Sequence, residues 1–289
     1  MSLLAILLVL GAALAHAAWN VIAHAGSGSG IPFIWCGAFA STVLWLPIVP
    51  FTGGIGPSLS GFLAGIAVSS VLHVAYMIVL QRGYAVGSLS TVYATARGTG
   101  PTITVIVAVL FLGERPSALA LAGVVAIIAG VVAAGLVDRQ RPTASVVRRG
   151  IDPAIAFGLL TGVTIALYTV WDAFVVRSWQ VNPVAFMVGC TAMECLLLAV
   201  PLRRRAAETL QLARRQWRTL VAFGVLSPLS YILVLEAVRI APVALVAPMR
   251  EVSVVLVSLF GAFVLREGRP ALRVAASVVV VAGIALLAM

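Results

Sequence analysis

Ten long apolar runs dominate this chain of 289 residues. Each run is close to the roughly 20 residues that a helix needs to cross the hydrocarbon core of a bilayer. The chain is 62% hydrophobic and only 10% charged, so a soluble fold would leave far too much apolar surface in water. We therefore predict an all-α integral membrane protein with ten transmembrane helices, at residues 2–23, 31–51, 58–80, 86–112, 117–137, 153–176, 183–202, 218–239, 242–265 and 270–288.

Features of the first half recur in the second half at offsets of 151 to 153 residues. The recurring pairs are Arg97 and Arg250, Glu114 and Glu267, Trp19 and Trp171, Asn20 and Asp172, Pro32 and Pro183, and Pro50 and Pro201. Five helices per repeat is an odd number, so the second repeat must enter the membrane inverted, and such repeats place a substrate site near the midplane. We predict two five-helix repeats, residues 1–137 and 153–289, joined by a linker at 138–152; the other long connection is 203–217.

The net charge of +10 does not indicate a nucleic-acid-binding protein. All 19 basic residues are arginines, and most of them lie in short gaps between apolar runs, a pattern typical of membrane topology signals. Of the seventeen arginines outside the helix interiors, fourteen fall in the loops on one side of the predicted membrane. The positive-inside rule then predicts that both termini face away from the cytoplasm.

Arg97 and Arg250 lie well inside the fourth and ninth predicted helices. A charge near the bilayer centre costs about 2.5–3.5 kcal/mol on insertion scales, so it indicates function. We predict a broken fourth helix at Pro101, beside Arg97, because proline removes a backbone donor. Val254 stands where the second repeat would carry that proline, so only one of the two helices is expected to break. The planar fork of arginine suits a carboxylate or phosphate, and we expect both residues to bind the anionic group of a substrate, the alternative being a folding role.

The first and sixth helices carry matching polar and aromatic stripes. Each stripe has i, i+3 and i+4 spacing, which places its members on one helix face. These residues are predicted to line a cavity, or alternatively to hold helices together through polar contacts; they are His16, Trp19 and Asn20 in the first helix and Tyr168, Trp171 and Asp172 in the sixth.

Further candidates lie in the third, fourth and seventh helices. Tyr93 shares the face of Arg97, and Tyr76 lies one turn after His73. Glu194 is the acid that we expect to balance an arginine or to bind a cationic group.

Other acids and glycines are expected to be structural. Glu251 follows Arg250 but should point about 100° away from it around a regular helix. Glu114 and Glu267 end helices beside arginines. Small-residue faces for close helix contact are predicted at Gly61 and Gly65 and at Gly158 and Gly162.

Four motifs resemble the drug/metabolite transporter superfamily of the EamA type: His16 to Asn20, Ala96 to Pro101, Leu112 to Pro116 and Ala247 to Glu251. The resemblance implies a ten-helix secondary transporter of the bacterial inner membrane, with a central cavity lined by helices 1, 3, 4, 6, 8 and 9 and with the fifth and tenth helices at the rim. An arginine in both halves resembles a branch associated with phosphonate use, and related sugar-phosphate exchangers carry basic residues on helices four and nine. Members with known folds keep both termini in the cytoplasm, opposite to the arginine count.

The sequence thus predicts a transporter, most simply an exporter, of a small anionic or zwitterionic metabolite. A cationic-drug exporter is the alternative, although its usual membrane-embedded glutamate is absent from the first helix, which offers His16 and Asn20. A membrane enzyme on lipid-linked substrates would need carboxylate pairs or metal-ligand clusters, and none is evident. The expected partners are a small-molecule substrate and the lipid bilayer, with no nucleic acid, no cofactor and no metal, in a monomer or homodimer.

Overall fold

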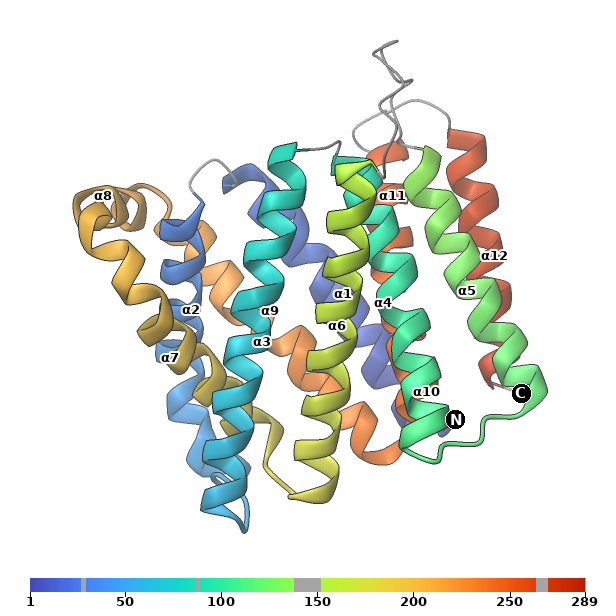
Figure 1. Cartoon of the computed structure of the whole chain (residues 1–289), viewed down its shortest axis with the longest axis horizontal. Helices are drawn as coiled ribbons and strands as arrows, with labels where there is room; N and C mark the ends of the chain where they lie inside the picture. Colours follow the sequence, from blue (N-terminus) through green and yellow to red (C-terminus); the bar gives the residue numbers. More distant parts are fainter. Residues whose placement is uncertain (27–29, 87–88, 138–151, 264–269, 289) are drawn as a thin grey trace. The chain divides into compact units, whose positions relative to one another are not determined.

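The computed structural model of the chain describes residues 1–26, 30–86, 89–137, 152–263 and 270–288. These ranges hold α-helices and two short 3-10 helices, with no strand among them, so the predicted all-α class is confirmed for this part of the chain. The α-helices are α1 (Leu3–Gly26), α2 (Ile31–Trp45), α3 (Leu59–Val86), α4 (Leu89–Phe111), α5 (Ala118–Val137), α6 (Pro153–Ser178), α7 (Pro183–Leu202), α8 (Ala206–Arg215), α9 (Trp217–Ile240), α10 (Val243–Arg250), α11 (Val252–Phe263) and α12 (Pro270–Ala288) (Figure 1).

Exposed apolar side chains indicate that the helices lie in a lipid bilayer. By length and composition, six helical segments of the described residues can cross a membrane, and three shorter apolar helices lie at Leu3–Trp19, Ala118–Ala134 and Ala271–Leu287. Large apolar side chains are exposed along these helices, among them Leu110, Val125 and Val278. Soluble monomers rarely expose such contiguous apolar surface, whereas a bilayer stabilises it.

Two connections differ from the sequence prediction. The segment predicted as a loop at 203–217 contains the 3-10 helix η3 (Arg203–Arg205) and the helix α8, which buries Thr209 and Leu212. A second 3-10 helix, η2 (Leu46–Thr52), extends α2 and includes Pro50.

The helix break lies in the opposite half from the predicted one. Helix α4 continues through Pro101, where Thr102 Oγ1 donates to the carbonyl of Gly98 at 2.6 Å, and hydroxyl groups of this kind help to accommodate proline within a membrane helix. The predicted ninth helix instead divides at Glu251 into α10 and α11. Pro248 precedes that division, and the Glu251 amide donates to the Pro248 carbonyl at 3.0 Å, an i to i+3 bond of the tighter 3-10 type.

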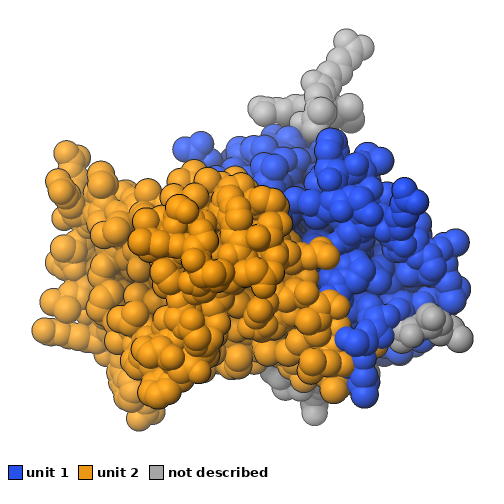
Figure 2. Space-filling view, turned by 90° about the horizontal axis from the view of Figure 1, so that it is seen from below, with its two compact units in different colours: residues 1–3, 75–170, 241–289 blue, residues 4–74, 171–240 orange. Residues whose placement is uncertain are grey.

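By its internal contacts the chain divides into two compact units (Figure 2). Unit 1 contains residues 1–3, 75–170 and 241–289, and unit 2 contains residues 4–74 and 171–240. Each unit therefore takes segments from both sequence halves, and the boundaries between units fall within α3 and α6.

Unit 1 is organised around α5, which packs along α12 and also contacts α4, α10 and α11 (Figure 1). The α5 and α12 backbones approach closely at two glycines. A Cβ atom at Gly123 would lie 2.7 Å from the carbonyl oxygen of Gly283, and one at Gly283 would lie 2.8 Å from that of Gly123. Similarly, a Cβ at Gly158 of α6 would lie 2.6 Å from Thr95 of α4, so the close contact predicted for Gly158 is confirmed.

In unit 2, α2 packs against α7, α8 and α9. Phe33 and Cys36 of α2 form an apolar core with Leu212 and Leu220. A polar bridge also joins α2 to α7, between the hydroxyl groups of Thr42 and Thr191 at 2.8 Å.

Candidate functional site

Two buried arginines and one glutamate meet in unit 1. Arg97 comes from the middle of α4, Arg250 ends α10, and Glu251 occupies the turn before α11. One guanidinium nitrogen of Arg97, Nη1, donates to both carboxylate oxygens of Glu251, at 2.9 and 3.2 Å, and Arg250 Nη2 lies 3.4 Å from Glu251 Oε1. All three residues are buried, with Glu251 only 1% exposed.

The acid that meets the arginines differs from the predicted one. The sequence favoured Glu194, which belongs to unit 2, and it placed Glu251 on another face from Arg250. That reasoning assumed a regular helix, in which consecutive residues point about 100° apart. Because the helix ends at Arg250, the turn brings the Glu251 carboxylate back to its neighbour and to Arg97.

Tyrosines surround this charged group. The Arg97 guanidinium lies 5.1 Å from the ring centroid of Tyr93, within range of a cation–π interaction. Tyr76 of α3 and Tyr168 of α6 pack edge to face, with 5.7 Å between ring centroids, and both lie within electrostatic range of Arg97. The structure thus brings four predicted site residues of unit 1 together, namely Arg97, Tyr76, Tyr93 and Tyr168. Arg250 also lies within electrostatic range of Tyr76.

The charge balance defines the chemistry of this cluster. Two guanidinium groups face one carboxylate, so the three side chains carry a net charge of +1 in a buried environment. An arginine side chain can offer an anion two parallel hydrogen bonds. We name Arg97, Arg250, Glu251, Tyr76, Tyr93 and Tyr168 the arginine cluster.

Glu114 fixes the start of the helix that carries Arg250. Its Oε1 and Oε2 accept hydrogen bonds from the backbone amides of Val243 and Ala244, both at 2.9 Å. These amides open α10 and would otherwise lack an intrahelical acceptor, and a carboxylate is also favoured at this positive end of the helix dipole. The predicted structural role of Glu114 is confirmed, while its repeat counterpart Glu267 lies outside the described residues.

Replacing Glu114 by alanine is expected to destabilise the protein by about 0.5–2 kcal/mol, the usual cost of losing an N-terminal cap. Glu114→Gln should cost less, because it keeps one oxygen acceptor. Thermal unfolding in detergent, followed by circular dichroism, measures both. The control is Glu236→Ala, which removes a half-exposed carboxylate 3.1 Å from Arg239, and such a pair contributes only about 0–1 kcal/mol. Equal losses of thermal stability in Glu114→Ala and Glu236→Ala would contradict the capping role of Glu114.

The stripe predicted on α1 contributes to packing in unit 2. His16 and Trp19 meet edge to face at 4.9 Å, and Trp19 meets Phe223 of α9 in the same way at 5.3 Å. These contacts support the alternative of helix packing for the two aromatic rings. The side chain of Asn20 lies outside the described residues.

The stripe predicted on α6 divides among three environments. Tyr168 belongs to the arginine cluster in unit 1. Trp171 donates its indole N–H to the carbonyl of Gly65 at 3.1 Å and stacks near Phe174, which favours packing. Asp172 is completely buried and accepts a hydrogen bond from Tyr231 at 2.6 Å, with Glu194 of α7 within electrostatic range.

The second half of the chain matches a known family model. Residues 152–289 match the model of the EamA-like transporter family. This part of the chain is therefore similar to EamA-like transporters. The match supports the predicted resemblance to the drug/metabolite transporter superfamily of the EamA type, and together with the apolar helices it indicates a multi-pass membrane protein.

Solved structures share the fold of this EamA-like protein. One crystal structure of a protein matches with a TM-score of 0.75, covering 98% of this chain and 95% of the other. At 15% sequence identity the likeness shows the fold alone. A search of the curated proteins gave no significant match.

The sequence missed two residues of these sites. Glu251 was visible as an acid beside Arg250, and Pro248 upstream was the signal that the helix would break there. Tyr231 gave no signal beyond a hydroxyl in an apolar helix, whereas His73 was a candidate together with Tyr76 in the third helix.

Proposed function

We propose that this EamA-like protein is a secondary transporter that exports a small anionic or zwitterionic metabolite across the bacterial inner membrane. The arginine cluster binds the anionic group of the substrate. The observation that supports this proposal is the burial of two arginine side chains, Arg97 and Arg250, against the carboxylate of Glu251. Retaining charged residues in a membrane helix is costly, so a function is the expected reason for them.

The composition of the cluster favours a zwitterion with an apolar portion. One arginine donates hydrogen bonds to the substrate carboxylate or phosphonate, while Glu251 accepts hydrogen bonds from an ammonium group. Tyr76, Tyr93 and Tyr168 offer ring faces to the remainder of the molecule, together with hydroxyl groups for orientation.

The proposed mechanism is alternating access between two inverted five-helix repeats, in ten spans. Helices at corresponding places in the two sequence halves pack against one another: α2 with α7, α4 with α10, and α5 with α12. Pairing of counterparts supports an inverted duplication, in which one repeat rocks against the other around the substrate. The arginine count favours both termini outside the cytoplasm, which would place the basic helix α8 inside.

A thermal-shift screen of the purified protein tests the substrate class. The probes are L-phenylalanine, 2-aminoethylphosphonate, succinate and the cation tetraphenylphosphonium. A bound probe raises the melting temperature by mass action. At a concentration of a hundred times its Kd, it adds about 2.7 kcal/mol to the free energy of unfolding. We expect a shift with an anionic or zwitterionic probe, lost in Arg250→Ala, and none with the cation.

A cationic-drug exporter is the second candidate function, and one observation supports it. Asp172 and Glu194 place two carboxyl groups in the interior of unit 2. Stabilisation by tetraphenylphosphonium alone, lost in Glu194→Gln, would overturn the anionic proposal in favour of this one.

A further inference from the structure

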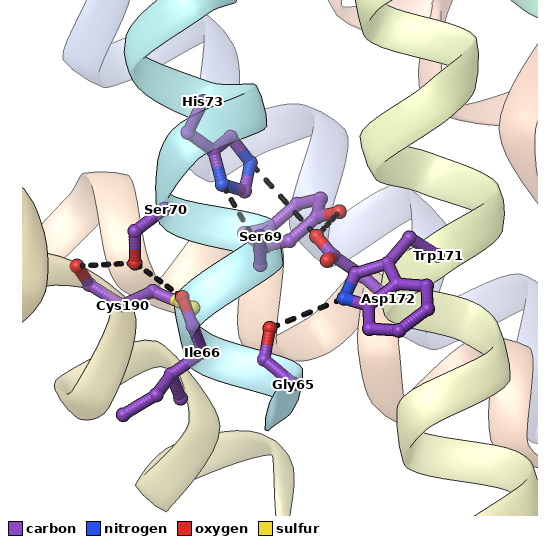
Figure 3. Close-up of polar contacts among 9 residues, drawn as sticks. Gly65, Ile66, Ser69, Ser70, His73, Trp171, Asp172 and Cys190 are labelled. Carbon is purple, nitrogen blue, oxygen red and sulfur yellow. Dashed lines mark hydrogen bonds and ion pairs between the residues drawn. The ribbon is translucent and has the colours of Figure 1, made fainter. Parts of the chain in front are cut away.

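A second titratable cluster lies in unit 2 and shares no residue with the arginine cluster. It joins three helices: α3 with His73 and α6 with Asp172 (Figure 3), and α9 with Tyr231. Asp172 is 0% exposed, and its Oδ2 both accepts the Tyr231 hydroxyl at 2.6 Å and lies 3.9 Å from His73 Nε2. We call these three residues the histidine–aspartate cluster.

Two polar groups and one aromatic ring contact the imidazole of His73. Its Nδ1 lies 3.3 Å from the hydroxyl of Ser69, one turn earlier in α3, while its Nε2 faces Asp172 (Figure 3). The ring also meets the Tyr231 ring edge to face, with 5.7 Å between centroids. In this arrangement a proton on Nε2 points toward the Asp172 carboxylate.

Other titratable groups of the same unit approach this cluster. From α7, Glu194 and Cys190 lie within electrostatic range of Asp172, and Cys190 also meets Ser70, whose hydroxyl donates to its carbonyl at 3.2 Å. From α1, His16 packs on Trp19. A protonated His73 is a cation within reach of Asp172.

The charge of the cluster depends on one proton. With His73 protonated, the imidazolium and the Asp172 carboxylate carry opposite charges; with His73 neutral, this pairing is lost while the Tyr231 hydroxyl still donates to the carboxylate. Histidine is the side chain whose charge changes in the physiological range, and an uncompensated buried charge is costly. Proton occupancy must therefore change the stability of the contact between α3, α6 and α9.

A metal ion does not fit this place. Within the part of the chain that the structure describes, no group of three or more histidine, cysteine, aspartate or glutamate side chains is arranged to hold one.

We propose that the histidine–aspartate cluster is the coupling-proton site of the transporter. His73 Nε2 carries the proton opposite Asp172 Oδ2, Tyr231 stabilises the carboxylate, and one proton enters as one substrate molecule leaves. The inference rests on the proposed transport function and adds the coupling ion to it. Helices α3 and α6 are shared between the clusters, because α3 carries His73 and Tyr76 and α6 carries Asp172 and Tyr168.

The protonation of His73 can be measured without a substrate. The chain has three histidines, so His16→Gln/His24→Gln leaves His73 alone for 15N solid-state NMR in liposomes. If that variant does not fold, the single variants assign the signals. We expect His73 to convert between imidazolium and imidazole within about pH 5–8, and the midpoint to move by about one pH unit in Asp172→Asn. A single protonation state throughout, or an unchanged midpoint, would overturn the proposal.

Coupling is tested in proteoliposomes with radiolabelled L-phenylalanine, 2-aminoethylphosphonate and succinate. An acidic interior of one pH unit should drive about tenfold accumulation through the wild type if one proton exchanges per molecule. His73→Gln should abolish accumulation and retain exchange of labelled for unlabelled probe at equal pH. Thr42→Val, which breaks a non-titratable bond between helices of the same unit, should accumulate like the wild type.

The outcomes separate the two proposals. Exchange by the wild type without any response to the pH gradient would overturn the proton site and leave the transport function standing. Accumulation by His73→Gln at the wild-type level, or its loss of exchange as well, would also overturn the proton site. If the wild type carries none of the three probes, the transport proposal fails, and the proton site is decided by the NMR titration.

Discussion

Arg97→Met is expected to abolish transport while the protein stays folded in the membrane. The substitution keeps the apolar stem of the side chain and removes the guanidinium group that lies 2.9 Å from Glu251. Arg250 still faces that carboxylate at 3.4 Å, so the remaining pair is neutral and the variant should fold. The excess positive charge is gone, however, and each lost hydrogen bond to a charged group weakens substrate binding by about 10- to 100-fold. Uptake into proteoliposomes should fall to the rate of empty liposomes.

The matched control is Arg82→Met, an exposed arginine of the same unit. It should leave uptake unchanged, because its charge lies outside the arginine cluster. Retention time in gel filtration and the melting temperature in detergent report folding of both variants. Uptake by Arg97→Met at the wild-type rate would exclude a substrate-binding role for Arg97.

Helix positions follow closely from the sequence because hydrocarbon imposes them. In lipid every backbone polar group must be satisfied within the segment, so long apolar runs have little alternative to a helix. The predicted run 117–137 became α5 at Ala118–Val137, and the predicted run 183–202 became α7 at Pro183–Leu202. The break at Glu251 was less accessible, because a proline in a membrane helix breaks it in one context and not in another, as Pro248 and Pro101 illustrate.

The sites were predictable only in part, because ionic partners depend on tertiary contacts. The cost of burying a charge identified Arg97 and Arg250 from the sequence, and offsets between repeats paired them. Neither argument could find Glu251, since its contact with Arg97 joins residues 154 apart in the chain. The histidine–aspartate cluster joins three helices, and nothing in the spacing of His73 and Tyr231 indicates that Asp172 lies between them.

Glu251→Gln should be the most destabilising substitution in the arginine cluster. Glutamine keeps the shape of the side chain but not its charge, so the net charge rises from +1 to +2 with Arg97 and Arg250 still buried. Removing one partner from a buried ion pair typically costs about 3–5 kcal/mol, because the opposite charge remains without compensation. The free energy of unfolding in mixed micelles should fall by this amount, or the protein should fail to accumulate.

The double variant Arg97→Met/Glu251→Gln separates electrostatics from packing. It restores a net charge of +1, carried by Arg250, so it should be more stable than Glu251→Gln alone even though it contains one more substitution. Neighbouring residues that interact directly show coupling energies of about 0.5–3 kcal/mol, and here the sign must be a rescue. Additive losses would mean that packing, and not charge, decides stability at this position. Because the rescued protein still lacks Arg97, it should remain unable to transport, which distinguishes a substrate-binding arginine from one that only balances Glu251.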